Sequence, residues 1–506
     1  MSTVRAMQTY SLSAQLLRNA RLHPDRVALI FDRQVLSWQG MLERTRRLAT
    51  MLVAEGAGAG DRIAILANNS ADYVALYFAI PWIGAIAAPI NTRLTADEIN
   101  AVLSAMDIRL LLHDQAHAEL AAQTTSRRRS DLSRIAVDAF KPTVDPAPVD
   151  QYADAMIFHT GGTTGLPKGV VLNQQSLLVN SLQWCVATGC NASDRFLIAP
   201  PMFHLVAGMN TIAGAMLGAA IVVLPRFDPE SVLTAIQTHQ VTKAAMVPVM
   251  LDMLFKSPNF GVSDLSSLRR VSYGGAPISP ELLDRTLRML PGIKLYQIYG
   301  QTECCGTVTC LGPEDHVPDD PAGKLRSAGR PIPLTEVAIL DPDGRPLATG
   351  EVGEICVRAP STSTGYFNNP EASAALFEFG WLHTGDAGYL DDDGFVFIVD
   401  RIKDMIVTGG ENVFAVEVEQ HLYLLDGVLQ CAVIGVASDS WGEQVHAVVH
   451  PAPGVQLSSE QVIAHCKAGL AGYKCPKSVS FSEQPLPMSA MGKILKRALR
   501  DAMPNA

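Results

Sequence analysis

The chain has 506 residues, of which 48% are apolar and 18% charged, and its net charge at pH 7 is −10. This length exceeds what one hydrophobic core holds and predicts at least two domains, while the composition excludes extensive disorder. The acidic balance argues against nucleic acid as a partner, because phosphate backbones need a basic surface. Nine cysteines without a C-x-x-C pair, and an N-terminus without a signal-peptide pattern, predict a cytoplasmic protein.

Short apolar runs alternate with helical patterns through the first half of the chain. Such alternation is typical of parallel sheets whose strands are connected by crossover helices. The runs are RIAILA (62–67), IRLLLH (108–113), AAIVVLP (219–225) and KAAMVP (243–248), and PESVLTAIQTHQ (229–240) is a representative helical pattern. Two uncharged stretches, 73–90 and 196–225, are divided by prolines and glycines, so we predict buried helices and strands there rather than a transmembrane segment.

The character of the sequence changes at residue 337. VAILDPDG, GEICVRA and GFVFIVD are typical of strands separated by turns, which predicts an antiparallel module over residues 337–400. The residues that remain are enough for a small domain of their own. The predicted fold is α/β, with a large N-terminal domain of two parallel-type αβ subdomains plus a small antiparallel β module (1–400), followed by a small mobile α+β C-terminal domain (401–506).

A glycine-rich stretch, TGGTTGLPKG at residues 160–169, suggests phosphate binding. Its glycines let backbone N–H groups approach an anion, its threonines add hydroxyl donors, and Lys168 adds a positive charge. A P-loop has glycine directly before the lysine and serine or threonine after it, but here Pro167 and Gly169 flank Lys168. A P-loop kinase or GTPase is therefore disfavoured, and a polyphosphate still fits.

Six further motifs follow this loop: PMFH (201–204), GGAP (274–277), YGQTE (299–303), TGD (384–386), DRIKDMIVTGGEN (400–412) and PMSAMGKILKR (487–497). In this order the motifs resemble the adenylate-forming superfamily of acyl-CoA synthetases, aryl-CoA ligases, luciferases and peptide adenylation domains. The resemblance covers nearly the whole chain. It implies an AMP- and pyrophosphate-forming acid–thiol ligase, which joins a carboxylic acid to ATP as an acyl-adenylate and transfers the acyl group to coenzyme A, with Mg²⁺ as cofactor.

The resemblance also implies roles for residues of the nucleotide site. Tyr299 stacks on adenine, Thr302 donates to the phosphate, and Glu303 binds Mg²⁺, which suits a hard carboxylate oxygen. Asp386 accepts the ribose hydroxyls, and Arg401 reaches the same ribose. The predicted ATP and AMP site comprises Thr160, Gly161, Gly162, Thr163, Thr164, Gly165, Lys168, Gly275, Ala276, Pro277, Gln297, Tyr299, Gly300, Thr302, Asp386, Ile398, Arg401 and Lys493. Gly161 replaces the family's usual serine, which removes one hydroxyl from the loop.

The C-terminal motifs resemble the moving parts of the family. Lys493 aligns with the lysine that contacts the reacting carboxylate and the α-phosphate, where a point charge suits the developing negative charge. Lys403 falls at the hinge position. Gly409, Gly410 and Glu411 are expected beside the pantetheine arm of coenzyme A, although the two glycines also fit a simple turn. The predicted catalytic residues are Lys493, His204, Glu303 and Thr302.

The predicted acyl pocket is apolar, and it comprises His204, Val206, Gly208, Gly275, Ile298 and Gly300. His204 falls at the family position between the pocket and the pantetheine tunnel, although a histidine in an apolar run is more often a core residue. The segment 203–208 lacks the acid that peptide adenylation domains use to bind an α-amino group. Ile298 stands where many members have glycine, so we expect a narrower pocket for an aromatic or a short- to medium-chain acid.

Two alternatives stay open beside the CoA ligase. The acyl group could be loaded onto a free-standing carrier protein, or the chain could be a non-catalytic sensor of nucleotide or acyl groups. The expected partners are a small carboxylic acid, ATP and CoA, and a homodimer is a further candidate. Intact Lys168, Glu303, Asp386, Arg401 and Lys493 favour the enzyme over the sensor.

Overall fold

The computed structural model describes residues 10–160, 168–276, 278–318, 320, 323–438, 440–488 and 494–503. The chain folds into two compact units. The first comprises Met1–Gly275, Asp284–Glu336 and Val357–Leu382, and the second comprises Ala276–Leu283, Val337–Cys356 and His383–Ala506. The predicted domain boundary between residues 400 and 401 stays a prediction.

One sheet of the first unit is parallel in its centre and antiparallel at both edges. Its central strands run in parallel from β13 to β1, as the alternating sequence pattern predicts. Its strand order is β15 (Arg330–Pro331), β14 (Thr309–Leu311), β13 (Lys294–Tyr299), β12 (Arg270–Gly274), β11 (Lys243–Met246), β9 (Arg195–Ile198), β10 (Ala220–Val223), β1 (Val27–Phe31) and β2 (Gln34–Ser37).

A second sheet of this unit is parallel from β7 to β6 and ends in an antiparallel edge. Its order is β18 (Gly365–Tyr366), β8 (Lys168–Asn173), β7 (Asp154–Thr160), β4 (Ile86–Pro89), β3 (Arg62–Leu66), β5 (Ile108–His113) and β6 (Arg129–Asp131). The antiparallel pair β7–β8 brackets the predicted phosphate loop, so both ends of that loop are fixed by sheet hydrogen bonds.

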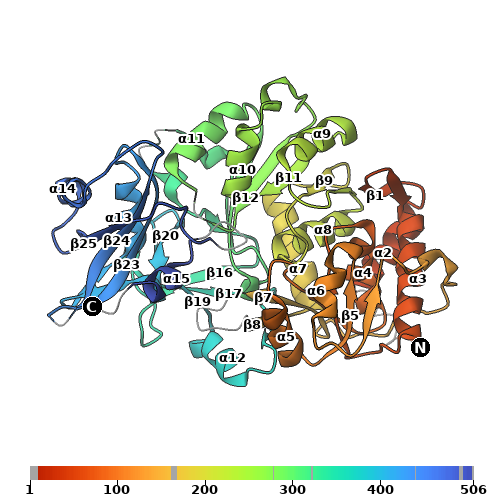
Figure 1. Ribbon diagram of the computed structural model, residues 1–506. Coiled ribbons are helices and arrows are strands. Elements are labelled where there is room, and N and C mark those ends of the chain that lie inside the picture. Colours follow the sequence, from red (N-terminus) through yellow and green to blue (C-terminus); the bar gives the residue numbers. More distant parts are fainter. Residues whose placement is uncertain are drawn as a thin grey trace. The chain divides into compact units, whose positions relative to one another are not determined.

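Helix α4 (Ala71–Trp82) explains how the two sheets share one core (Figure 1). It packs against β1 of one sheet and β4 of the other, and nearly every one of its side chains is buried. An all-apolar helix is stable in water only when it is covered on all sides. The side chain of Ser70 caps its N-terminus by accepting a hydrogen bond from the N–H of Tyr73 at 3.0 Å.

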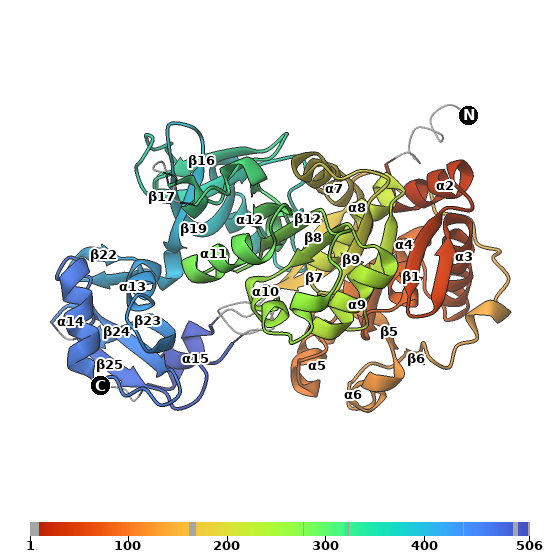
Figure 2. The same ribbon diagram turned by 90° about the horizontal axis from the view of Figure 1, so that it is seen from above.

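Further helices cover these sheets, and α7 packs against α8 beside the parallel strands (Figure 2). The helices that lie mainly in the first unit are α2 (Leu12–Leu22), α3 (Trp38–Ala54), α5 (Ala96–Ala105), α6 (Ala118–Ala122), α7 (Gln174–Thr188), α8 (Leu205–Leu217), α9 (Pro229–His239), α10 (Pro248–Phe255), α11 (Pro280–Met289) and α12 (Pro370–Leu376).

Two more sheets follow along the chain. The first, with antiparallel β19 and β20, has the order β16 (Glu336–Leu340), β17 (Gly353–Arg358), β19 (Leu382–Leu390) and β20 (Val396–Arg401). The last sheet has the order β22 (Glu411–Val413), β21 (Ile406–Thr408), β24 (Gly442–Pro451) and β23 (Val428–Ser438), and β25 (Ser478–Phe481) pairs with β24. Its helices are α13 (Ala415–Leu422), α14 (Ser459–Gly469) and α15 (Lys496–Asp501).

The predicted fold class is confirmed, because mixed αβ sheets precede an antiparallel module and a smaller α+β part. Residues 73–90 divide into α4 and β4, and residues 196–225 divide into β9, α8 and β10, as predicted. Within the described ranges, no helix combines the length and the apolar character that crossing a membrane requires. The predicted mobility of the C-terminal part stays a prediction.

Candidate active site

Strand β13 separates two groups of predicted site residues, because successive side chains of a strand point to opposite faces. Ile298 packs against an apolar cluster that includes Trp184. Gln297, one residue earlier, faces the other way, and its Oε1 accepts a hydrogen bond from the Tyr273 hydroxyl at 3.4 Å. The predicted acyl-pocket residue Ile298 therefore lies on one face of the strand, and the predicted nucleotide residues Gln297 and Tyr299 share the other.

The ends of β12 and β13 are built from glycines that no other residue could replace without displacing backbone. A β-carbon on Gly274 would lie 2.1 Å from the carbonyl oxygen of Ile298, and one on Gly300 would lie 1.9 Å from that of Gly306. Gly275 has a φ of +76°, which disfavours any other residue. The backbone at these three glycines therefore carries no side chain, at the edge where parallel sheets bind ligands.

In the first unit, Lys168 and Glu303 both contact Tyr366, the first at its ring and the second at its hydroxyl. The ammonium of Lys168 lies 4.7 Å from the centre of the Tyr366 ring, a cation–π distance. The hydroxyl of Tyr366 donates a hydrogen bond to Glu303 Oε1 at 2.9 Å. Glu303 is only 7% exposed. This arrangement holds a positive and a buried negative group close together without pairing them directly.

Strand pairing brings these three side chains together. In the β7–β8 hairpin, Thr160 pairs with Lys168, and β18 pairs with β8 and so sets Tyr366 beside that hairpin. The backbone carbonyl of Glu303 accepts a hydrogen bond from the N–H of Ser363 at 2.8 Å, just before β18. Tyr366 was not among the predicted site residues, although it holds the predicted metal ligand.

His204 lies directly before α8 and is half-buried. Its ring is tilted against that of Phe203, with 4.5 Å between the ring centres. Burial, together with the charge of Arg93, lowers the pKa of His204 to about 4, so the ring is neutral at pH 7. Among the described residues, its Nε2 atom has no hydrogen-bond partner. A buried nitrogen without a partner suits a residue that contacts a ligand better than one satisfied within the core.

Two other predicted pocket residues lie on the first turns of α8. Val206 is half-buried, whereas Gly208 is buried. A β-carbon on Gly208 would lie 3.0 Å from Phe158 Cζ and 3.5 Å from Tyr77 Cε2. This glycine therefore allows α8 to approach two aromatic rings of the core, a packing reason that the sequence did not reveal.

In the second unit, Asp386 and Arg401 form an ion pair. They lie opposite each other on β19 and β20, with Arg401 Nε 2.5 Å from Asp386 Oδ1. Asp386 is 5% exposed. The Thr384 hydroxyl accepts a hydrogen bond from the N–H of Asp386 at 3.1 Å and donates one to the carbonyl of Ile355 at 2.6 Å. These bonds fix the segment of β19 that carries Asp386, the residue predicted to accept the ribose hydroxyls.

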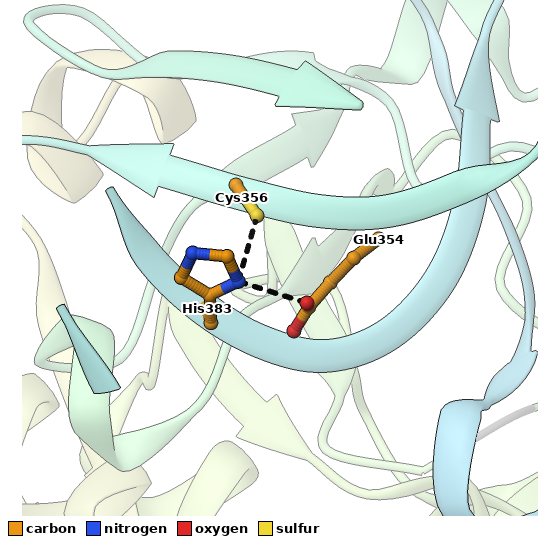
Figure 3. A group of neighbouring side chains, drawn as sticks. All are labelled: Glu354, Cys356 and His383. Atoms are coloured by element: carbon orange, nitrogen blue, oxygen red, sulfur yellow. Dashed lines mark hydrogen bonds and ion pairs between the residues drawn. The ribbon is translucent and has the colours of Figure 1, made fainter. Parts of the chain in front are cut away.

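Glu354, Cys356 and His383 form a cluster next to this segment of β19 (Figure 3). Glu354 Oε1 accepts a hydrogen bond from the N–H of Gly385 at 2.8 Å, and Oε2 lies 2.8 Å from His383 Nδ1. Cys356 Sγ lies 3.5 Å from the same nitrogen. Burial raises the pKa of the Cys356 thiol to about 12, so the free thiol stays protonated at pH 7. The contacts of the cluster form a hydrogen-bond network that positions this segment of β19.

The predicted CoA-binding glycines form the turn of the β21–β22 hairpin. Gly409 and Gly410 have φ values of +59° and +85°, as a two-residue hairpin turn requires. A β-carbon on Gly409 would also lie 2.5 Å from Cε3 of Trp441. Glu411 follows as an exposed residue of β22. The simple-turn interpretation is therefore sufficient to explain both glycines, and their role toward CoA stays a prediction.

The other predicted site residues differ in their secondary structure and in their exposure. Lys403 lies in the short 3₁₀ helix Ile402–Asp404, which directly follows β20, and Ile398 on β20 is exposed. Ala276 and Thr302 are half-buried. Gly161, Gly162, Thr163, Thr164, Gly165, Pro277 and Lys493 lie outside the described residues.

Comparison with known proteins identifies the family. Residues 16–367 match the family described as AMP-binding enzyme, and residues 417–493 match the AMP-binding enzyme C-terminal domain. The chain belongs to this family. Its relatives include a feruloyl-CoA synthase from Amycolatopsis sp, which is 37% identical over 495 residues, covering 98% of this chain and 99% of that protein.

Two further relatives extend the range of named activities. A fatty acid–[acyl-carrier-protein] ligase from Streptomyces coeruleorubidus is 35% identical over 497 residues, covering 96% of this chain and 94% of that protein. The solved structure of o-succinylbenzoate CoA synthetase from Bacillus subtilis, in complex with its acyl-adenylate intermediate, has a TM-score of 0.87 and 32% identity, covering 97% of this chain and 99% of that one.

These matches confirm the predicted enzyme class. This member of the AMP-binding enzyme family is an AMP-forming carboxylate–CoA ligase, and ATP and CoA are its co-substrates. The individual roles of the site residues stay predictions.

Proposed function

We propose that the chain activates an apolar aromatic or short- to medium-chain acid. A carboxylate oxygen attacks the α-phosphorus of ATP, and pyrophosphate leaves. The thiolate of CoA then attacks the acyl carbon, and AMP leaves. The first step brings two anions together, so the protein must provide positive charge and fixed hydrogen-bond donors before the bond forms.

The observation that carries this proposal is the arrangement of Lys168, Tyr366 and Glu303. Lys168 lies at the end of the predicted phosphate loop, where its ammonium suits the phosphate oxygens. Glu303 fits Mg²⁺, because it is a buried carboxylate that accepts from a neutral hydroxyl and, among the described residues, pairs with no lysine or arginine. When bound there, Mg²⁺ would neutralise charge on the phosphates.

The choice of acid rests on Ile298 and on the relatives. Its branched side chain occupies space beside Trp184, which favours a flat or short acyl group over a long chain. The relatives named for feruloyl and o-succinylbenzoyl groups both act on aromatic acids, which supports this choice. In the same proposal the neutral, half-buried His204 borders the acyl group.

The remaining roles concern the ribose and the C-terminal part. Asp386 accepts from the ribose hydroxyls and Arg401 contacts the same sugar. Lys403 is the hinge, and Lys493 reaches the reacting carboxylate only during adenylation.

Lys493→Ala should abolish acyl-adenylate formation yet spare thioester formation from supplied acyl-AMP. Equal loss of both half-reactions would contradict a role of Lys493 in adenylation alone.

A panel of acids tests the proposed function. Aromatic acids, C4 to C10 aliphatic acids and palmitate are each incubated with ATP and Mg²⁺, and pyrophosphate release is measured with hydroxylamine to trap the adenylate. Addition of CoA should yield the thioester and AMP. A higher kcat/KM for palmitate than for every aromatic and short-chain acid would overturn the proposed acid class.

A second acceptor is considered because one relative is named as an acyl-carrier-protein ligase. Pyrophosphate release with hydroxamate formation but without acyl-CoA, across the whole panel, would favour a carrier protein. Thioester formation with free CoA at a rate matching pyrophosphate release would favour CoA as the acceptor.

A cytoplasmic location belongs to the same proposal. The nine cysteines all lie in the described parts of the chain and are free there, as expected in a reducing compartment. A homodimer stays a prediction, which sedimentation analysis of the purified protein would test.

A further inference from the structure

Lys243, the first residue of β11, is a lysine with no exposed surface. Its ammonium donates a hydrogen bond to the Ser272 hydroxyl at 2.8 Å. It also lies 4.6 Å from the centre of the Trp184 ring and 5.4 Å from that of Tyr296. Burial lowers the pKa of Lys243 to about 8, so it stays mostly charged at pH 7.

This lysine lacks the ionic partner that a buried charge normally has. Within the described residues, no carboxylate oxygen lies within ion-pair distance of its ammonium. Asp194 contributes to its electrostatic surroundings, but that carboxylate already pairs with Arg269 at 3.3 Å and with Arg270 at 3.0 Å. Burying an unpaired ammonium is costly, and an apolar residue of similar volume would often be neutral or stabilising instead. Its presence therefore needs a reason beyond packing.

Strand register places this ammonium beneath the predicted acyl pocket. Ser272 pairs with Ala245 of β11 and with Tyr296 of β13, and Gly274 pairs with Ile298. Side chains two residues apart share a face, so the ammonium's partners lie on the same face as the predicted pocket residue Ile298.

Ser272 and Tyr296 stand one two-residue step, roughly 7 Å, before Gly274 and Ile298 along their strands. Trp184 lies beside both positions, because its ring contacts Lys243 and Ile298 packs against the cluster that includes Trp184. In an aromatic acid, the substituent opposite the acyl chain is separated from that chain by one ring. This separation is about as long as the two-residue step between Ile298 and the partners of Lys243.

We propose that Lys243, with Ser272, is the specificity-determining pair that binds an oxygen at the end of the acid remote from the reacting carboxylate. The preferred substrate is therefore an aromatic acid with a hydrogen-bond-accepting oxygen opposite its acyl chain. This inference rests on the proposed function and names its substrate class. The ammonium donates to that oxygen, while Trp184 and Tyr296 flank the ring that carries it.

The experiment compares acids that differ only in the remote group. Cinnamate derivatives and benzoate derivatives bearing 4-hydroxyl, 4-carboxyl, 4-methyl or hydrogen are assayed for pyrophosphate release at saturating ATP. The wild-type enzyme should prefer a 4-oxygenated acid to its 4-methyl counterpart by about tenfold or more, because an unmet buried donor costs about 1–3 kcal/mol. The hydroxyl and carboxyl arms show whether that oxygen belongs to a phenol or to a second carboxylate.

Variants then assign this preference to the lysine. Lys243→Met should reverse the preference toward the 4-methyl acid through a raised KM for the oxygenated one, and Ser272→Ala should weaken it. Lys256→Met is the matched control, because Lys256 is an exposed lysine that pairs with Asp252 on α10. If Lys243→Met lowers kcat/KM by the same factor for all acids, or if the wild-type enzyme prefers the 4-methyl acid, the proposal is wrong.

These outcomes are separable from failure of the proposed function. Pyrophosphate release with aliphatic acids but with no 4-oxygenated aromatic acid would overturn only the role of Lys243. Absence of pyrophosphate release with every acid of the panel would overturn the proposed function itself. If Lys243→Met does not fold, as thermal unfolding would show, Ser272→Ala and the wild-type preference still decide the proposal.

Discussion

Two buried carboxylates, Glu303 in the first unit and Asp386 in the second, have partners of different charge. Glu303 accepts a hydrogen bond from the neutral hydroxyl of Tyr366, whereas Asp386 is paired with the guanidinium of Arg401. A neutral donor leaves a carboxylate its full charge, and a cation cancels much of it. The difference teaches that burial alone does not define the chemistry of an acid. Glu303 suits a metal cation, and Asp386 suits neutral hydroxyl groups.

Removing the charge of Glu303 should have the largest effect on activity among these predictions. Glu303→Gln keeps the shape and the hydrogen bond with Tyr366 but removes the charge. The rate of pyrophosphate release should fall about 100- to 1000-fold, the usual cost of losing one electrostatic contact to the reacting phosphates. Exposed Glu351→Gln is the control. An unchanged dependence of activity on Mg²⁺ concentration would contradict a metal-binding role.

Asp386→Asn tests the other carboxylate. Hydrogen bonds to a charged group contribute about 1.5–3 kcal/mol, so the KM for ATP should rise about 10- to 100-fold with a smaller change in kcat. The wild-type enzyme should discriminate against 2′- and 3′-deoxy-ATP, and the variant should lose much of that discrimination. Equal discrimination by both proteins would show that the ribose is bound elsewhere. Exposed Asp343→Asn is the matched control.

Tyr366→Phe removes only the neutral hydroxyl that donates a hydrogen bond to Glu303. One hydrogen bond contributes about 1 kcal/mol, so the Mg²⁺ concentration at half-maximal activity should change by about fivefold. The ring that contacts Lys168 remains, which confines the change to Glu303. Tyr152→Phe, at an exposed tyrosine, should leave the titration unchanged. The same change in both variants would remove Tyr366 from the site.

Glu354→Gln should have the smallest effect, because Glu354 acts on Asp386 only through the neighbouring residue Gly385 of β19. Loss of the charged acceptor for Gly385 and His383 should lower the free energy of unfolding by about 0.5–1 kcal/mol, as the group is partly exposed. The KM for ATP should rise less than in Asp386→Asn, and urea unfolding and ATP titration measure both effects. A larger rise than in Asp386→Asn would place Glu354 in contact with the nucleotide.

The sequence was sufficient for the fold class and the family, because ordered motifs and strand–helix alternation are local patterns. It was also sufficient to select Glu303 and Asp386. It could not reveal the partners that give these acids their character. Tyr366 reaches Glu303 across 63 residues, and Glu354 reaches Gly385 across 31. No spacing rule connects such pairs, because only the folded chain brings them together.

The surroundings of Lys243 also could not be predicted from the sequence. In the sequence it is one lysine before an apolar strand, where an exposed position is the usual interpretation. Only the register of β11, β12 and β13 shows that its ammonium is enclosed by Ser272, Trp184 and Tyr296. Gly208 is similar, since the rings packed against it come from other elements.

The glycines at the strand ends have a consequence for the evolution and redesign of acid preference. Gly274 and Gly300 are closed to mutation, because any side chain there would collide with a neighbouring carbonyl group. Ile298, which pairs with Gly274 and lies two residues before Gly300, packs against the apolar cluster of Trp184 and can be exchanged for a smaller or larger residue. In the proposed pocket, exchange of Ile298 changes the space for the acid and exchange of Lys243 or Ser272 changes its polar contacts, while the glycine backbone of the strand ends is inherited unchanged.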